Sequence, residues 1–259
     1  MEQARKIKVG ISIGDPNGIG IEVILKIFQE KELFDFFTPI VYGNIKLISF
    51  QKRHLDLKTS LCPYKEGNKL SLNQVNVIDV WNNSFTTEFG KSTEEGGIRA
   101  LKSLKAATKA LKENKVDVLV TAPIDKHNIQ SESFKFPGHT DYLSNELGGK
   151  SLMFMIAEEL KVGLLTDHVP VSEVAQLITP DRIEEKASLM MKSLKNDFGI
   201  SKPKIGVLGI NPHTGDSGII GKEDDEVLRP TLKKLYKQGD IILGPVSYTH
   251  LRAHETDSY

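Results

Sequence analysis

The sequence predicts an α/β protein with a largely parallel sheet and covering helices. Short strand-like runs rich in Val and Ile alternate along the chain with amphipathic helical stretches, an order typical of parallel sheets. The chain has 259 residues, 39% of them hydrophobic, which is enough for one large or two ordinary domains. Tight loops rich in Gly, Pro, Asn and Asp follow several of the expected strands.

The first part of the chain contains a strand, a tight loop and a helix in succession. Residues 7–13 predict a strand, the loop from Gly14 to Gly20 follows, and residues 21–31 have helical apolar spacing. Residues 39–42 predict a second strand. Residues 52–83 alternate short apolar pairs with polar residues, so the pattern assigns no element there.

The next expected element is a helix that begins at Thr93, and a strand over residues 116–120 follows it. The loop from Thr121 to Lys126 comes after this strand, and two further strands are expected over residues 152–157 and 162–165. One face of this helix is apolar and carries Ile98, Leu101, Leu104, Ala107 and Leu111.

A helix with well-marked ends is expected after these strands. Thr179 is a suitable N-cap, Pro180 fits the first helical position, and Gly199 ends the helix. Its apolar stripe consists of Ile183, Ala187, Met190, Met191, Leu194 and Phe198. The last expected elements are a strand over 204–210, a helix over 223–238 and a strand over 240–243.

Composition and charge exclude several functional classes. Lys+Arg and Asp+Glu both number 34, and no long basic run offers a footprint for nucleic acid. The single cysteine, Cys62, excludes an internal disulfide and a multi-cysteine zinc site, which fits a reducing compartment. No apolar run approaches the ~20 residues that span a bilayer. We therefore expect a cytoplasmic protein that binds neither nucleic acid nor membrane.

Three histidines each lie in a loop that opens directly after an apolar, strand-like run. They are His139, His168 and His213. Loops at the carboxyl ends of parallel strands gather at one edge of a sheet, so these side chains are candidates for one ligand or metal site. His168 and His213 are the stronger pair, because neutral imidazole binds divalent ions well and the neighbouring Asp167 and Asp216 are able to orient the rings.

The loop from Gly14 to Gly20 fits a dinucleotide-binding fingerprint only poorly. Val23 stands where the third glycine is required, and the expected acidic residue after the second strand is absent. Two other interpretations stay open. Asp15 and the glycines permit close contact with a ligand, or the loop is a tight strand-to-helix turn with a helix-capping role.

Three of these loops together resemble one enzyme family. The runs Gly14-Asp15-Pro16-Asn17-Gly18-Ile19-Gly20, Gly138-His139-Thr140-Asp141 and Asn211-Pro212-His213-Thr214-Gly215-Asp216-Ser217-Gly218-Ile219-Ile220-Gly221 closely resemble 4-hydroxythreonine-4-phosphate dehydrogenases of pyridoxal phosphate biosynthesis. The resemblance extends from about Lys8 to Pro245 in unbroken motif order.

The resemblance implies a fold, a reaction and partners. It implies the two-domain fold of isocitrate and isopropylmalate dehydrogenases, NAD or NADP bound without the Rossmann fingerprint, and a homodimer with a shared cleft. The implied reaction oxidises 4-phosphooxy-L-threonine to 2-amino-3-oxo-4-phosphooxybutanoate, which loses CO₂ to give 3-amino-2-oxopropyl phosphate. The substrate is thus a small phosphorylated amino or hydroxy acid.

The same resemblance implies roles for individual residues. His168 and His213 match two ligands of a divalent metal, which is zinc, magnesium or cobalt. His139 and Thr140 match substrate contacts. Lys126 and Asp125 are looser candidates for charge or proton handling, with ordinary surface residues as the alternative. The cofactor contacts and the catalytic base are not assigned.

The sequence also suggests how the chain is divided. A boundary is expected near residue 130, with a first α/β domain over 1–130 and a second over 131–245 that carries the metal and substrate loops. Residues 246–259 resemble translated adaptor sequence, so we expect a foreign tail in which His250 and His254 have no ligand role. Family members continue beyond this point into a segment with a third metal histidine and further substrate contacts. We therefore expect a truncated, inactive chain.

Three other functions remain open at this point. A dehydrogenase of a related phosphorylated hydroxy acid, such as a phosphothreonate or phosphoerythronate, would share the same histidine loops. Acyl transfer to phosphate, as in phosphotransacetylases, fits the broader fold but leaves His168 and His213 unexplained. A non-catalytic ligand-binding or structural relic is the third.

Overall fold

A computed structural model describes residues 5–158 and 160–247. The chain forms two compact units, Met1–Ser151 and Leu152–Tyr259. The division lies later than the expected position near residue 130, because Phe134 and Tyr142 are buried in one cluster with Leu101 and Leu104. That packing ties the segment after residue 130 to the first unit.

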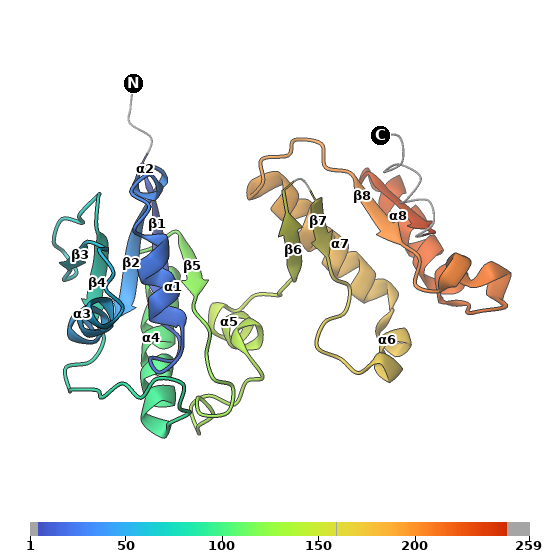
Figure 1. Cartoon of the computed structure of the whole chain (residues 1–259). Helices are drawn as coiled ribbons and strands as arrows, with labels where there is room; N and C mark the ends of the chain where they lie inside the picture. The colour runs from blue at the N-terminus through green and yellow to red at the C-terminus, as the bar shows by residue number, and fades with distance from the viewer. Residues whose placement is uncertain (1–4, 159, 248–259) are drawn as a thin grey trace, which may run out of the picture. The chain divides into compact units, whose positions relative to one another are not determined.

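The first unit contains a five-stranded sheet in the order β3-β4-β2-β1-β5 (Figure 1). Every neighbouring pair in this sheet is parallel. Gly10 of β1 is paired with Ile40 of β2 on one side and with Leu119 of β5 on the other. The strands are β1 (Ile7–Ser12), β2 (Phe37–Gly43), β3 (Leu61–Pro63), β4 (Val75–Asp79) and β5 (Val118–Thr121).

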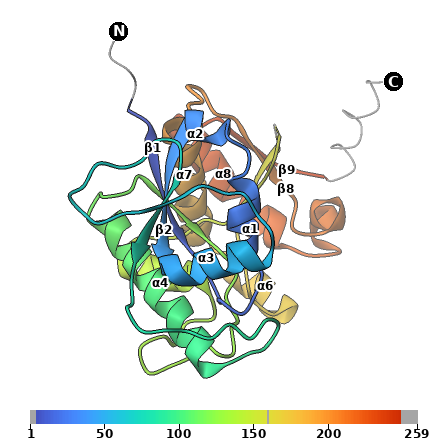
Figure 2. The same ribbon diagram turned by 60° about the vertical axis from the view of Figure 1, so that its left-hand side comes forward.

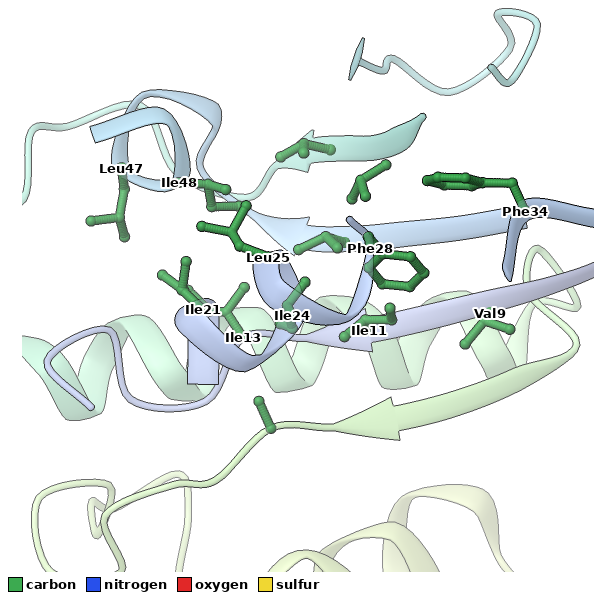
Figure 3. Packing of buried hydrophobic residues seen from close by; sticks show 14 of the residues in the cluster. Val9, Ile11, Ile13, Ile21, Ile24, Leu25, Phe28, Phe34, Leu47 and Ile48 are labelled. Atoms are coloured by element: carbon green, nitrogen blue, oxygen red, sulfur yellow. The ribbon is translucent and has the colours of Figure 1, made fainter. Parts of the chain in front are cut away.

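Helices cover both faces of this sheet, as Figure 2 shows for α1, α3 and α4. Val41 of β2 belongs to a core cluster with α1 (Gly20–Ile27) and α3 (Ile45–His54), part of which is drawn in Figure 3. Its neighbours Ile40 and Tyr42 instead pack with Ala107 and Ala110 of α4 (Glu94–Lys112). Successive side chains of a strand point to opposite faces, so one strand serves both helix layers.

Two more helices complete the first unit. The short helix α2 (Leu33–Phe36) buries Phe34, which stacks on Phe28 with the ring centroids 5.7 Å apart. Helix α5 (His139–Leu147) packs against α4 through an aromatic cluster of Phe134, Phe136 and Tyr142. Residues 52–83, where the sequence assigned nothing, contain the end of α3 and the strands β3 and β4.

The second unit contains two small sheets (Figure 1). β6 (Phe154–Ala157) and β7 (Leu160–Gly163) form an antiparallel hairpin, whereas β8 (Ile205–Leu208) and β9 (Ile242–Val246) are parallel. A core of α7 (Pro180–Asn196), α8 (Arg229–Lys237) and β8 joins Ile183, Leu194, Ile205, Leu232 and Leu235. A short helix, α6 (Val171–Leu177), precedes α7.

The predicted start of α7 is confirmed, but the helix ends at Asn196, before Phe198 and Gly199, and the helix expected over 223–238 is interrupted. Thr179 accepts a hydrogen bond from the N–H of Arg182, and Pro180 occupies the first turn. The later helix consists of a π-helical turn, Asp224–Leu228, followed by α8. Pro230 has no N–H for the residue four positions earlier, so a regular α-helix cannot run through this point.

The α/β class with a mostly parallel sheet is confirmed. Within the described ranges, none of the helices combines the length and the apolar character that a membrane crossing needs. Of the tail predicted over 246–259, Val246 and Ser247 are described, and Val246 pairs with Leu208 in the β8–β9 sheet. His250 and His254 lie outside the described residues.

Candidate functional site

The carboxyl ends of β1 and β5 form the topological switch point of the first sheet. β1 continues into α1 on one face, whereas β5 is reached from α4 on the other. Adjacent parallel strands with connections on opposite faces leave a crevice for a ligand beyond their carboxyl ends. The two loops meet there, because the N–H of Asp15 donates to the carbonyl of Pro123 at 2.9 Å.

A buried polar network joins three loops at this edge. Asp15 accepts hydrogen bonds from the N–H of Asn17 and from Nδ2 of Asn128, both at 2.8 Å. Asn17 in turn donates from Nδ2 to Oγ1 of Thr93 at 2.9 Å and accepts from the N–H of Glu88 at 2.8 Å. Asp15 and Asn17 are 6% and 3% exposed. The carboxylate therefore acts as an internal brace between the loops that follow β1 and β5.

This bracing differs from the helix-capping role that the sequence left open for the Gly14–Gly20 loop. No side chain caps the first turn of α1, whose N-cap is Ile19. Gly14 has a φ of +68°, and a Cβ there would lie 2.0 Å from the carbonyl oxygen of Pro123. Glycine is required at this position because the two loops approach each other backbone to backbone.

The start of α4 packs equally closely against the loop after β5. A Cβ at Gly97 would lie 1.9 Å from the carbonyl oxygen of Asn128. Oδ1 of Asn128 is buried and has no hydrogen-bond partner within the described part of the chain. It lies 3.0 Å from the position of a Cβ at Gly97, so this side chain too is packed against the start of α4.

His139 is the first residue of α5, and this differs from the expected loop after a strand. The preceding segment forms only an isolated bridge between Ser131 and Phe134, because its aromatic side chains pack into the cluster against α4 instead of pairing in a sheet. Nε2 of His139 is buried without a hydrogen-bond partner among the described residues. Burial and the nearby Lys126 ammonium hold the pKa of His139 below its ordinary value.

The neighbouring Asp125 has a structural function in this loop. Its carboxylate accepts from the N–H of His127 at 2.8 Å and from the N–H of Asn128 at 3.3 Å. The side chain of Ser92 and these backbone donors lower the pKa of Asp125, which keeps it ionised. Asp125 therefore orients the loop that carries Lys126 and Asn128.

His168 and His213 belong to the second unit and follow β7 and β8, as expected. Both are exposed. Nδ1 of His168 lies 3.8 Å from Oδ1 of Asp167, which is too far for a hydrogen bond that would orient the ring. His213 begins a run of six residues with positive φ, from His213 to Gly218. No described contact joins Asp216 to the ring of His213.

Two imidazoles suit a divalent ion chemically, but they form an incomplete set of ligands. Within residues 5–158 and 160–247, no group of three or more His, Cys, Asp or Glu side chains is arranged to hold a metal ion. The metal role of His168 and His213 therefore rests on the sequence resemblance. A complete site requires at least one further ligand.

A family model described as pyridoxal phosphate biosynthetic protein PdxA matches residues 35–253. The chain belongs to this family. The matched range runs past Pro245 into the segment that the sequence assigned to a foreign tail, so the foreign origin of that segment stays a prediction.

Named relatives of the PdxA family agree with the match. A 4-hydroxythreonine-4-phosphate dehydrogenase of Bacteroides thetaiotaomicron is 40% identical over 94% of this chain and 67% of its own length. A protein of Oceanobacillus iheyensis, provisionally named a D-threonate 4-phosphate dehydrogenase, is 31% identical over 94% of this chain and 74% of its own. The crystal structure of a 4-hydroxythreonine-4-phosphate dehydrogenase from Burkholderia phymatum has a TM-score of 0.83 and 26% identity, and the match covers 95% of this chain and 76% of that chain.

The sequence pointed to only part of this PdxA-family site. His139 and Lys126 were both named and lie close together, since a Cβ at Gly138 would be 4.0 Å from Cε of Lys126. Asn17, Thr93 and Asn128 were not identified as site residues. The motif around Asn17 and the helix start at Thr93 were visible signals, whereas no pattern marks Asn128.

The low pKa of His139 gives a first prediction. Lys126→Met is expected to raise the pKa of His139 but to leave it below about 6.5, because burial is the larger cause. In the unfolded chain His139 binds a proton more readily than in the folded chain. The free energy of unfolding is therefore expected to fall as the pH drops below about 6.5. NMR titration of the histidine rings measures the pKa. Lys46→Met, on α3, is the control, and an unchanged His139 pKa in Lys126→Met would refute the influence of Lys126.

Proposed function

We propose that this PdxA-family chain acts in the oxidation of 4-phosphooxy-L-threonine by NAD or NADP during pyridoxal 5'-phosphate biosynthesis. The product would be 2-amino-3-oxo-4-phosphooxybutanoate, which loses CO₂ to give 3-amino-2-oxopropyl phosphate. The observation that carries the proposal is the 40% identity, over 94% of this chain, to a relative named for this activity. The position of His139 near Lys126, in the loop that follows β5, is consistent with it.

The proposed roles follow from position and chemistry. His139 and Thr140, at the start of α5, would hydrogen-bond the polar groups of the substrate. Since the pKa of His139 is lowered, its ring is neutral near pH 7 and offers both a donor and an acceptor nitrogen. Lys126 would attract the anionic substrate, and Asp125 would orient that loop.

Two bound groups would supply the redox and electrostatic chemistry. A nicotinamide would be the hydride acceptor for the carbon of the secondary alcohol, and a divalent ion would polarise the oxygen of that alcohol. His168 and His213 would be two ligands of that ion, which is zinc, magnesium or cobalt. Because the described residues offer only two such ligands, we propose that this chain binds the ion weakly and is inactive or nearly so. The homodimer and the cytoplasmic location expected from the sequence belong to the same proposal.

A second candidate substrate is a phosphorylated hydroxy acid without the amino group. The 31% identity to the relative provisionally named a D-threonate 4-phosphate dehydrogenase favours it. The two candidates differ in an ammonium group. The higher identity to the 4-hydroxythreonine-4-phosphate dehydrogenase, 40% against 31%, leads us to prefer the amino acid.

Calorimetric binding of 4-phosphooxy-L-threonine tests the proposal without requiring turnover. We expect binding that His139→Ala weakens at least tenfold, since a charge-assisted hydrogen bond contributes about 1.5–3 kcal/mol. His54→Ala, an exposed histidine on α3, should bind as the unaltered chain does. Tighter binding of D-threonate 4-phosphate would favour the second substrate. Absence of binding to both compounds would contradict the proposal.

A further inference from the structure

We propose that Asp224 is a positioning residue that holds the loop carrying His213 in an unusual left-handed conformation. The inference concerns the segment between β8 and α8, in orange in Figure 1. Its meaning for catalysis rests on the proposed function, in which His213 is a metal ligand. The effect on loop conformation is independent of that function and is tested separately.

The conformation that needs support is a run of six positive φ angles. The residues His213, Thr214, Gly215, Asp216, Ser217 and Gly218 have φ values of 52°, 53°, 85°, 46°, 56° and 90°. Residues with a side chain disfavour this region because Cβ crowds the following carbonyl oxygen, and only the two glycines escape that crowding. A run of this kind persists only where surrounding contacts hold it.

The carboxylate of Asp224 supplies such contacts at the start of the run. Its Oδ1 accepts from the N–H of Ile210 and its Oδ2 from the N–H of Asn211, both at 2.9 Å. Nδ2 of Asn211 also lies 3.2 Å from Oδ2 of Asp224 and 2.8 Å from Oε2 of Glu223. The carbonyl of Asn211 then accepts from the N–H of Thr214 at 3.0 Å. The two residues held by Asp224, Ile210 and Asn211, thus lie just before the left-handed run.

Asp224 is itself fixed by the core of the second unit. Its side chain is fully buried, with 0% exposure, and it begins the π-helical turn Asp224–Leu228. Leu228, at the end of that turn, is 1% exposed in the same cluster as Leu194 and Leu232. A buried carboxylate must have its oxygens hydrogen-bonded, and here backbone and amide N–H groups meet that need. The carboxylate that holds the loop therefore belongs to the buried π-helical turn and not to the loop itself.

The space around the loop restricts it to this arrangement. A Cβ at Gly215 would lie 2.2 Å from the carbonyl oxygen of Gly221, and one at Gly209 would lie 2.8 Å from the methyl group of Thr214. A Cβ at Gly221 would lie 2.5 Å from Nδ2 of Asn211. These glycines allow residues 209–221 to pack closely around the Asn211–Asp224 contact. The carboxylate of Asp224 then fixes the position of the loop.

The test compares Asp224→Asn with Asp225→Asn. The asparagine side chain keeps the shape of Asp224 but has one acceptor oxygen, so its NH₂ group would face an N–H donor. Asp225 is exposed and pairs with Arg229 at 3.0 Å, which makes it a matched control. We expect amide hydrogen exchange in peptides over residues 209–221 to be at least tenfold faster in Asp224→Asn and unchanged in Asp225→Asn. Exchange in α7 should stay as in the unaltered chain.

Unchanged exchange over 209–221 in Asp224→Asn would overturn the proposal. If Asp224→Asn also loses protection in α7, the milder Asn211→Ala decides. That change removes only the Nδ2 contacts, so faster exchange confined to 209–221 supports the clamp and unchanged exchange refutes it.

Zinc binding by calorimetry separates this inference from the proposed function. With zinc alone as the probe, we expect Asp224→Asn to weaken binding at least tenfold and His213→Ala to abolish it. If His213→Ala binds zinc as the unaltered chain does, the metal role of His213 fails while the exchange result still stands. If Asp224→Asn leaves the zinc affinity unchanged while His213→Ala abolishes binding, the inference that Asp224 positions His213 for metal binding fails.

Discussion

Gly97→Ala is expected to destabilise the first unit by about 2–4 kcal/mol. On helix propensity alone the change would stabilise α4 by about 1 kcal/mol, because alanine is the better helix former. The contact reverses the sign, since the new Cβ would lie 1.9 Å from the carbonyl oxygen and 2.4 Å from the carbonyl carbon of Asn128. Both are backbone atoms, so neither moves without displacing the loop after β5.

Urea unfolding followed by tryptophan fluorescence measures this change. Trp81 is the single tryptophan of the chain and is 5% exposed in the first unit, so its signal reports that unit. Gly149→Ala is the control, because no atom lies within 4 Å of the added Cβ and its φ is not positive. We expect the control to remain within about 0.5 kcal/mol of the unaltered chain. Equal stabilities of the two variants would show that α4 and the loop adjust freely.

The parts of the fold that the sequence predicted are those in which local pattern and packing agree. The residues Leu101, Leu104 and Ala107 recur at helical spacing and are buried on α4. Thr179 marks the start of α7 by accepting a hydrogen bond from the N–H of Arg182, and Pro180 fits the first turn because it needs no N–H there. Each of these features depends on neighbours within four residues, which a sequence pattern displays directly.

The site residues that escaped prediction depend on distant contacts. Asn128 acquires its role from Asp15, which is 113 positions away, and from the close approach of Gly97. No local pattern encodes such a pairing, because it exists only after β1 and β5 become neighbours in the sheet. The pattern around His139 was misleading for a related reason. Its apolar residues predicted a strand, but their partners are the aromatic cluster against α4.

The loops that carry His168 and His213 show the same difference between features set by local pattern and features set by distant contacts. The sequence placed His168 and His213 correctly after β7 and β8. The sequence contained no indication of the left-handed run from His213 to Gly218, in which four of the six residues have a side chain that disfavours positive φ. The conformation comes from a carboxylate in the following helical turn, Asp224. The positions of these loops along the chain were therefore predictable from the sequence, while the backbone conformation of the His213 loop was not.

Asp15→Ala and Asp15→Asn are expected to differ by about 1–3 kcal/mol in their effect on the first unit. Alanine removes the acceptor of the buried N–H of Asn17 and of the partly buried Nδ2 of Asn128. A buried unsatisfied donor costs about 1–3 kcal/mol and the partly buried Nδ2 costs less, so we expect a loss of about 2–4 kcal/mol. Asparagine still accepts from Asn17. Its NH₂ group would face Asn128, whose amide is able to rotate and present Oδ1, an atom that lacks a partner among the described residues.

Unfolding of the Asp15 and Asn128 variants, followed by Trp81 fluorescence, tests this bracing. Asp35→Ala, an exposed aspartate on α2, is the control and should change stability by no more than about 0.5 kcal/mol. The double variant Asp15→Ala/Asn128→Ala should be more stable than the sum of the single changes by at least about 0.5 kcal/mol, because the two side chains share one hydrogen bond. Strict additivity would mean that Asp15 and Asn128 stabilise their loops independently. The crevice between β1 and β5 would then depend on Gly14 and Gly97, where backbone contact alone holds the loops together.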